Sequence, residues 1–221
     1  YSGFYGGLRG KWLPVDALSN LVGHGIRLPT STVALDVWSE DVPKLGLAIE
    51  RGDPDSQGVP VAGSLVRVPW ATQPTAQMLV TLYDPTSDEP GPLEPRHVLQ
   101  KVQEGWRAHG LTPVVATEME FYLVDMALSD AGHPQPPMPP GWTERLSGGQ
   151  VYDMDVVDAF AVFLTEVTIA CKAQGVPADT VIAEYGTGQF EVNLTHESDA
   201  LMAADHCLML KRIVKAVAIK H

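Results

Sequence analysis

The sequence predicts an α+β protein, and two observations support that prediction. The first 84 of the 221 residues hold short β-forming runs separated by Gly, Pro and Asp, without the pattern of a long helix. Beyond a proline-rich stretch at residues 84–95, long helical patterns alternate with strands. We therefore expect a small, mainly β domain at residues 1–90 and a larger mixed domain at residues 91–221.

The first domain is expected to contain short strands joined by turns. Residues 39–60 are rich in Gly, Pro and Asp and are predicted to form a loop, with a turn at residues 51–55. The expected strands lie at residues 4–13 (two strands around a Gly-rich bend), 31–38, 63–70 and 75–84.

The second domain is expected to open with a helix from Pro95 to about Ala108. Proline is favoured in the first turn of a helix, and Gly110 follows as a stop signal. Three apolar residues recur at helical spacing, so this helix is expected to pack on a sheet. They are Val98, Val102 and Trp106.

Two further helices are expected later in the chain. Asp153 or Asp155 is predicted to cap a helix that runs to Gln174, and Ser198 or Asp199 to cap one that continues to the last residue. The first of these helices has one broad apolar stripe, which is typical of a core helix. Its members are Val156, Phe160, Phe163, Leu164, Val167 and Ala170.

Two predicted strands concentrate carboxylates. Alternate side chains of a strand share a face, so Glu118 and Glu120 lie together. Glu184 precedes a Gly-rich turn and Glu191 lies in the strand that follows it. Neither stretch contains Lys or Arg, and buried carboxylates without a cationic partner are costly. We therefore expect the four glutamates to bind a hard divalent cation.

The overall composition limits the partners of the chain. A net charge of −12 argues against nucleic acid or an anionic membrane surface as the main partner. We expect no signal peptide and find no uninterrupted apolar run of membrane-spanning length. The two cysteines, Cys171 and Cys207, provide no disulfide framework, which favours a reduced intracellular setting. The expected location is the cytoplasm.

Several motifs occur in a fixed order along the whole chain. The most specific pair is EMEFYLVD at residues 118–125 followed by EYGTGQFEVNL at residues 184–194. The others are LRGK, RLPTSTVALDV, GDPD, VPW, EPRHVL, GVPAD and DALMAADHCLMLKRIVKAVAIKH. In these motifs the chain resembles the glutamine synthetase family, and within it the branch that joins glutamate to putrescine.

The resemblance implies a β-grasp domain at residues 1–90, beside a catalytic domain built on an antiparallel sheet. It also implies an ATP-dependent ligase that forms γ-glutamyl phosphate from glutamate. An amine, either ammonia or a polyamine such as putrescine, then displaces the phosphate. In the family, further parts of the active site lie beyond the position that matches residue 221, so we expect residues 91–221 to be a truncated catalytic domain.

The resemblance also implies roles for individual residues. Glu120, Glu184 and Glu191 would hold the cation next to the substrate carboxylate, and Glu118 would contribute to a second cation at the ATP phosphates. Oxygen ligands select Mg²⁺ or Mn²⁺, which neutralise charge at the transferring phosphoryl group.

Two less specific matches to the family concern residues that would contact the nucleotide and the incoming amine. His196 matches a nucleotide-contacting position. Asp36 lies near the position where the family's N-terminal domain offers an aspartate to the active site of the neighbouring subunit, in which it deprotonates the incoming ammonium. The expected catalytic residues are Asp36 and Glu184. Because active sites of the family lie between subunits, a homo-oligomeric ring is expected.

Two other function classes compete with the ligase. A two-metal hydrolase would use the same carboxylates, but its expected His and Asp ligands are missing from the motifs. A non-catalytic scaffold or binding relative would be expected to have lost some of the four glutamates, and all four are present. The ligase is the favoured hypothesis.

Overall fold

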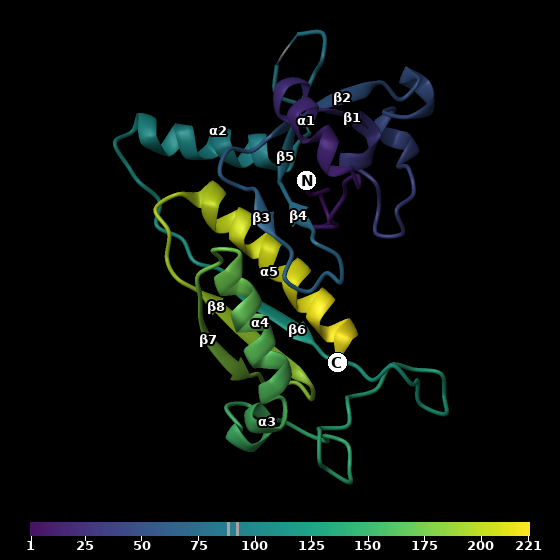
Figure 1. Cartoon of the computed structure of the whole chain (residues 1–221), viewed down its shortest axis with the longest axis vertical. Helices are drawn as coiled ribbons and strands as arrows, with labels where there is room; N and C mark the ends of the chain where they lie inside the picture. Colours follow the sequence, from purple (N-terminus) through teal and green to yellow (C-terminus); the bar gives the residue numbers. More distant parts are fainter. Residues whose placement is uncertain (88, 92) are drawn as a thin grey trace. The chain divides into compact units, whose positions relative to one another are not determined.

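The structure is a computed structural model that describes residues 1–87, 89–91 and 93–221. The described residues fall into two compact units (Figure 1): Tyr1–Val68 with Gln73–Pro113, and Pro69–Thr72 with Val114–His221. Both units combine helices with antiparallel strands, as expected for an α+β protein. The β-grasp topology and the domain boundary near residue 90 stay predictions.

The described residues of the first unit form two antiparallel sheets, with strand orders β1-β2-β5 and β3-β4. The strands are β1 (Ile26–Pro29), β2 (Asp55–Pro60), β3 (Val66–Arg67), β4 (Ala76–Gln77) and β5 (Val80–Tyr83). The helices are α1 (Leu18–His24), α2 (Pro95–Ala108) and the 3-10 turns η1 (Val15–Ala17), η2 (Thr30–Val33), η3 (Pro43–Leu45) and η4 (Ile49–Arg51). Leu28, Val33 and Leu82 are buried in its core.

The two strands expected at residues 4–13 are absent from that described segment. An isolated bridge joins Ser2 to Leu8, and the N–H of Gly6 donates to the carbonyl of Gly3 at 3.0 Å. Gly6 has a φ of 66°, which glycine adopts readily. The Gly-rich bend therefore forms, but no strand ladder extends from it in the described residues.

The strand expected at residues 31–38 is also wrong. Pro29 ends the earlier strand β1, and the chain turns through η2. Proline has no N–H to donate to a ladder. Asp36 then closes a local turn, because its Oδ1 accepts the N–H groups of Trp38 at 2.8 Å and Glu40 at 2.9 Å. Such local bonds satisfy the backbone without a partner strand.

The remaining predictions for the first unit place strands at the right positions but with the wrong lengths, and the loop prediction misses one strand. The expected strands at residues 63–70 and 75–84 correspond to β3 and to β4 with β5. The expected loop at residues 39–60 contains η3, η4 and the whole of β2. Strand β2 pairs with β1 on one side and β5 on the other, which makes it the central strand of its sheet.

Helix α2 has the predicted bounds, but it does not bury its apolar stripe. Val98, Val102 and Trp106 are each half-exposed within the described chain. The polar side of the helix is buried instead. The Nε2 atom of His97 lies 3.0 Å from Thr81 Oγ1 and 3.1 Å from the carbonyl oxygen of Leu82, both in β5. The helix does contact the sheet, as predicted. The prediction that Val98, Val102 and Trp106 make this contact is wrong, because His97 on the polar side makes it.

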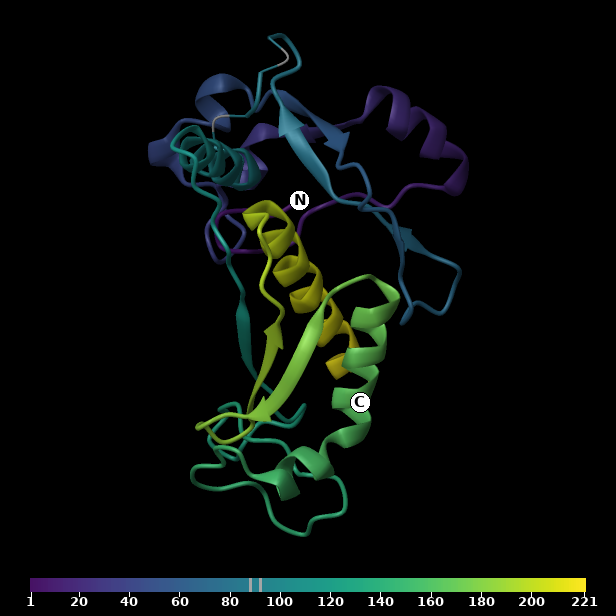
Figure 2. The same cartoon turned by 90° about the vertical axis from the view of Figure 1, so that its left-hand side faces the viewer.

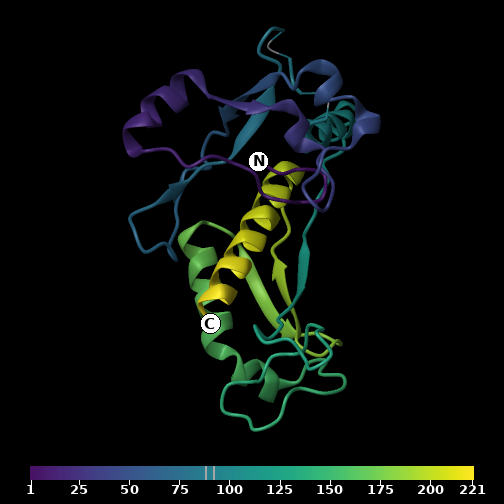
Figure 3. The ribbon, with the colours of Figure 1, turned by 90° about the vertical axis from the view of Figure 1, so that its right-hand side faces the viewer.

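In the described part of the second unit, three strands form one antiparallel sheet in the order β6-β8-β7. The strands are β6 (Glu118–Tyr122), β7 (Ala178–Ala183) and β8 (Gln189–Leu194), and the helices are α3 (Met154–Ala159), α4 (Ala161–Ala173) and α5 (Ala200–Lys220). Helices α4 and α5 lie on the same face of this sheet (Figures 2 and 3). Phe190 of β8 is fully buried on that face, with its ring 5.2 Å from that of Phe160. The face of the sheet opposite α4 and α5 carries polar side chains.

The helix expected from residue 153 to residue 174 is two helices. Phe160, with φ −98° and ψ 12°, separates α3 from α4, and its ring packs edge-on against Phe190. Asp153 is the cap, because its Oδ1 accepts the N–H groups of Asp155 at 2.9 Å and Val156 at 3.3 Å. The six stripe residues are all buried, as predicted.

The last helix and the strand before the Gly-rich turn complete the unit. Helix α5 follows Asp199, whose Oδ1 accepts the N–H groups of Leu201 and Met202. Strand β7 was not predicted. Its ladder with β8 shifts register between Ala178 and Val181, which interrupts the alternation of buried and exposed side chains.

Candidate metal centre

Four glutamates share the sheet face that lies opposite α4 and α5. Glu120 of β6 lies directly across from Glu191 of β8, and Glu118 lies across from Asn193. Glu184 follows the end of β7, on the other side of β8. The antiparallel register therefore brings carboxylates from three segments of the chain onto one surface.

The four carboxylates differ in exposure and act on one another. Glu191 is 7% exposed, Glu184 is half-buried, and Glu118 and Glu120 are exposed. Burial is the main reason that the pKa of Glu191 is raised, and the charges of Glu118 and Glu184, a hydrogen bond with Glu184 and the charge of Glu120 raise it further. Like charges placed opposite each other destabilise a sheet. A bound cation would relieve this repulsion.

A glutamine orients one of the carboxylates. The Nε2 group of Gln189 donates to Glu120 Oε2 at 2.6 Å, and Gln189 Oε1 accepts from Tyr122 Oη at 3.1 Å and from the N–H of Gly186 at 2.8 Å. A Cβ atom on residue 186 would lie 2.5 Å from Tyr122 Oη. A larger residue there would have to displace the ends of the Tyr122 and Gln189 side chains.

The donor set suits a hard cation, although the side chains are not closed around one point. Within the described ranges, no group of three His, Cys, Asp or Glu side chains is spaced to hold a metal ion. In the same residues no Lys, Arg or His forms an ion pair with the four glutamates. Asn193 Oδ1, opposite Glu118, is buried without a hydrogen-bond partner there. Carboxylate and amide oxygens of this kind are the donors that Mg²⁺ and Mn²⁺ prefer in proteins.

The other predicted site residues lie elsewhere. His196 is exposed, two residues after the end of β8. Asp36 belongs to the first unit, and its Oδ1 accepts two backbone N–H groups of its own turn. Their roles with nucleotide and amine stay predictions.

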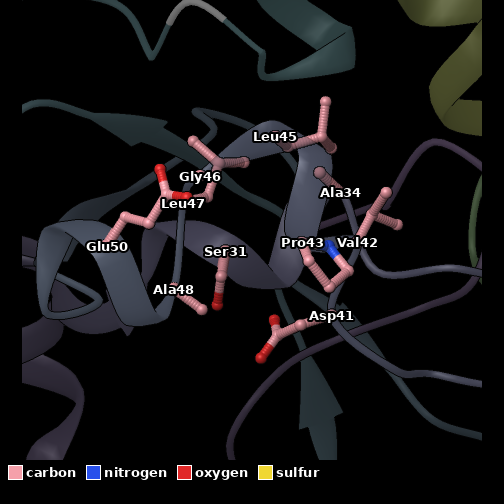
Figure 4. Close-up of a pocket in the computed structure, with 10 residues that line it drawn as sticks. All are labelled: Ser31, Ala34, Asp41, Val42, Pro43, Leu45, Gly46, Leu47, Ala48 and Glu50. Carbon is pink, nitrogen blue, oxygen red and sulfur yellow. The ribbon is translucent and has the colours of Figure 1, made fainter.

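The first unit contains a hollow of about 200 Å³ (Figure 4). It is smaller than the roughly 300–1,000 Å³ typical of ligand pockets. Its lining residues are Ser31, Ala34, Asp41, Val42, Pro43, Leu45, Gly46, Leu47, Ala48 and Glu50. None of the predicted site residues lines this hollow.

Among the described residues, no helix combines the length and the apolar character that crossing a membrane requires.

Curated relatives of the chain include several enzymes named as ligases or synthetases. The chain is 42% identical, over 98% of its length, to the γ-glutamylputrescine synthetase PuuA of Escherichia coli, of which it covers 45%. It is 29% identical, over 78% of its length, to a glutamate–isopropylamine ligase of a Pseudomonas species, of which it covers 36%. The chain thus spans less than half the length of these relatives.

Solved structures support the fold. The ADP complex of GmaS aligns with 100% of the chain at a TM-score of 0.76 and 22% identity, and the chain covers 46% of it. A novel glutamine synthase homolog aligns with 96% of the chain at a TM-score of 0.77 and 24% identity, with 46% of that homolog covered. Likeness at such low identity is evidence for the fold alone.

The family model of the glutamine synthetase catalytic domain matches residues 92–221, which is more than half of the chain. This match includes β6, β8 and all four glutamates of the open sheet face. It confirms the resemblance carried by the sequence motifs. The chain belongs to the glutamine synthetase family.

Proposed function

We propose that this chain is part of an ATP-dependent ligase that joins the γ-carboxylate of glutamate to an amine through γ-glutamyl phosphate. The observation that supports this most is the convergence of four glutamates on one sheet face within the region matched by the family. The names of two relatives favour an organic amine over ammonia, and the relative with 42% identity favours putrescine or a similar polyamine. A cytoplasmic location and a homo-oligomeric ring belong to the same proposal.

Glu120, Glu184 and Glu191 would hold one divalent cation, and Glu118 would contribute to a second. Bound Mg²⁺ or Mn²⁺ would supply positive charge beside the phosphate oxygens of ATP and the carboxylate of glutamate. Gln189 keeps the carboxylate of Glu120 on the shared face through its 2.6 Å hydrogen bond. Asp36 is proposed to act on the incoming amine, and His196 to contact the nucleotide. Glu184 is proposed to be catalytic through the cation that it helps to hold.

Calorimetric titration of Mn²⁺ into the 221-residue chain tests the cation site. We expect saturable binding by the parent chain and none by the Glu120→Gln, Glu191→Gln double variant. A matched control is Glu104→Gln, Glu166→Gln, which removes the same charge from α2 and α4 rather than from the sheet face. The control should bind like the parent.

Equal binding by all three proteins would contradict the proposal, because the affinity would then follow net charge rather than the site. Absence of binding by a folded parent chain would contradict it as well. The circular dichroism spectrum of each variant shows whether it is folded.

A further inference from the structure

The carboxylates of Glu184 and Glu191 belong to one β-turn-β segment. Glu184 directly follows β7, Glu191 lies in β8, and residues 185–188 form the turn between them. The N–H of Glu184 donates to the carbonyl of Gln189 at 2.9 Å, which closes the turn. The separation of the two carboxylates therefore depends on the shape of this turn.

The side chain of Gln150 reaches into the same turn from the loop before α3. Its Nε2 group donates to the carbonyl of Gln189 at 2.7 Å, and its Oε1 accepts the N–H of Gly188 at 2.8 Å. Both ends of the amide are thus engaged, which fixes its orientation. Gln150 is only 4% exposed, so water does not replace these partners readily.

The backbone around Gln150 also follows the turn. The N–H of Gln150 donates to the carbonyl of Tyr185 at 3.3 Å, and that of Tyr152 to the carbonyl of Ala183 at 2.9 Å. Tyr152 has a φ of 57°, which is uncommon for a residue other than glycine. Residues 150–152 therefore include a strained backbone conformation where they contact the turn. Such strain persists only where the surrounding structure holds the backbone in place.

We propose that Gln150 is a positioning residue that holds Glu184 and Glu191 at the separation needed for a shared cation. The proposal rests on the cation site proposed above. The carbonyl of Gln189 accepts both the amide of Gln150 and the N–H of Glu184. Without the Gln150 amide, this carbonyl and the buried N–H of Gly188 each lose one hydrogen bond. The turn is then held less firmly, and the carboxylates of Glu184 and Glu191 move apart because they repel each other.

The test compares Gln150→Leu with Gln174→Leu in the 221-residue chain. Gln174 is an equally buried glutamine in the same unit, but it caps the C-terminus of α4, at the opposite end of β7 from Glu184. Partners that orient metal ligands are typically worth about 10–100-fold in affinity. We expect Gln150→Leu to weaken Mn²⁺ binding by at least about tenfold. Gln174→Leu should lower the melting temperature similarly and leave the affinity within about twofold.

A second measurement needs no metal. Hydrogen–deuterium exchange should be faster in Gln150→Leu at residues 184–191, and unchanged there in Gln174→Leu. If Gln150→Leu does not fold, Gln150→Asn serves in its place, because its shorter amide cannot reach both backbone partners. Wild-type affinity in the Gln150 variant, or equal weakening in both variants, would overturn the proposal.

The exchange measurement separates the two proposals. If the parent chain binds no Mn²⁺, the cation site fails. Faster exchange confined to residues 184–191 would still support the positioning of the two glutamates by Gln150. Unchanged exchange there would overturn it.

Discussion

Glu191 is buried beside three other carboxylates, so it should oppose folding while it favours cation binding. Replacing it with glutamine keeps its shape and removes the like charge opposite Glu120. We expect Glu191→Gln to stabilise the metal-free chain by up to about 1 kcal/mol, the size of a cross-strand pair effect. Urea unfolding in the presence of a chelator measures this. A lower stability of the variant would mean that the carboxylate is stabilised by contacts rather than strained by repulsion.

Cys171 is predicted to be inert because it is fully buried in α4. Burial raises the pKa of its thiol to about 12, from an ordinary value of 9.0. The folded chain therefore keeps the thiol protonated, and this contribution to stability is complete below pH 9 and is lost as the pH rises above it. Iodoacetamide at pH 8 should modify the half-buried Cys207 first, and Cys171 only after unfolding.

The same cysteine gives a check on pH dependence. The melting temperature of the parent chain should fall more steeply between pH 9 and pH 10.5 than that of Cys171→Ala, in which the titrating group is absent. Mass spectrometry of the alkylated peptides identifies which thiol reacts. Rapid modification of Cys171 in the folded chain at pH 8 would be incompatible with the burial seen here.

At the level of elements, the Gly-rich turn depends on Gly188. Its φ is 77°, and a Cβ atom there would lie 2.9 Å from the carbonyl oxygen of Leu123. Gly132 has a φ of 79° and no atom within 4 Å of such a Cβ. We expect Gly132→Ala to cost about 1 kcal/mol from left-handed backbone strain alone. Gly188→Ala should cost about 1–3 kcal/mol more, because backbone atoms must also move.

Thermal unfolding of the two alanine variants measures the difference. Gly188→Ala should also weaken Mn²⁺ binding, since the turn sets the positions of Glu184 and Glu191. Equal destabilisation by the two substitutions would show that the close approach to Leu123 is not kept in solution.

Sequence patterns predicted the elements whose side chains repeat regularly over many residues. The strict alternation at Glu118 and Glu120, and the long apolar stripe that runs through α3 and α4, each determine one burial face. The short segments of the first unit were predicted less well, because local bonds such as those of Asp36 compete with strand pairing. The stripe of α2 is half-exposed in the described chain, because periodicity indicates an apolar face but not what covers it.

In the candidate site too, residues in regular strands are predicted from the sequence and residues in irregular loops are not. Alternation predicted that Glu118 and Glu120 share one face of their strand, and the alternating burial of β6 agrees with it. The position of Glu191 directly across from Glu120 depends on the pairing of β6 with β8, which the alternation does not predict. Nothing in the sequence pattern marks Gln150, since it lies in an irregular loop with no periodic signal and reaches the site only through hydrogen bonds to backbone atoms. Its part in the site depends on tertiary contacts that a single sequence does not reveal.

At the level of the whole molecule, cation binding should increase the free energy of unfolding. A ligand present at 100 times its dissociation constant stabilises the folded state by about 2.7 kcal/mol. We therefore expect Mn²⁺ to raise the melting temperature of the parent chain but not that of the Glu120→Gln, Glu191→Gln variant. Because the chain has a net charge of −12, NaCl at matched ionic strength is the control for general screening.

Screening by NaCl should shift both proteins to a similar extent. A rise in melting temperature with Mn²⁺ that is equal in the parent and the variant would indicate diffuse association with an acidic surface instead of a defined site.

Strand β6 is an outer strand of its sheet in the described residues, so one side of its backbone has no strand partner there. An unpaired strand edge is a template on which another chain can add and begin to aggregate. Glu118 and Glu120 project from this strand, and a second copy pairing with it would bring its own carboxylates alongside them. Charges on an edge strand discourage such pairing. The carboxylates proposed to attract a cation would therefore also disfavour self-assembly through this edge.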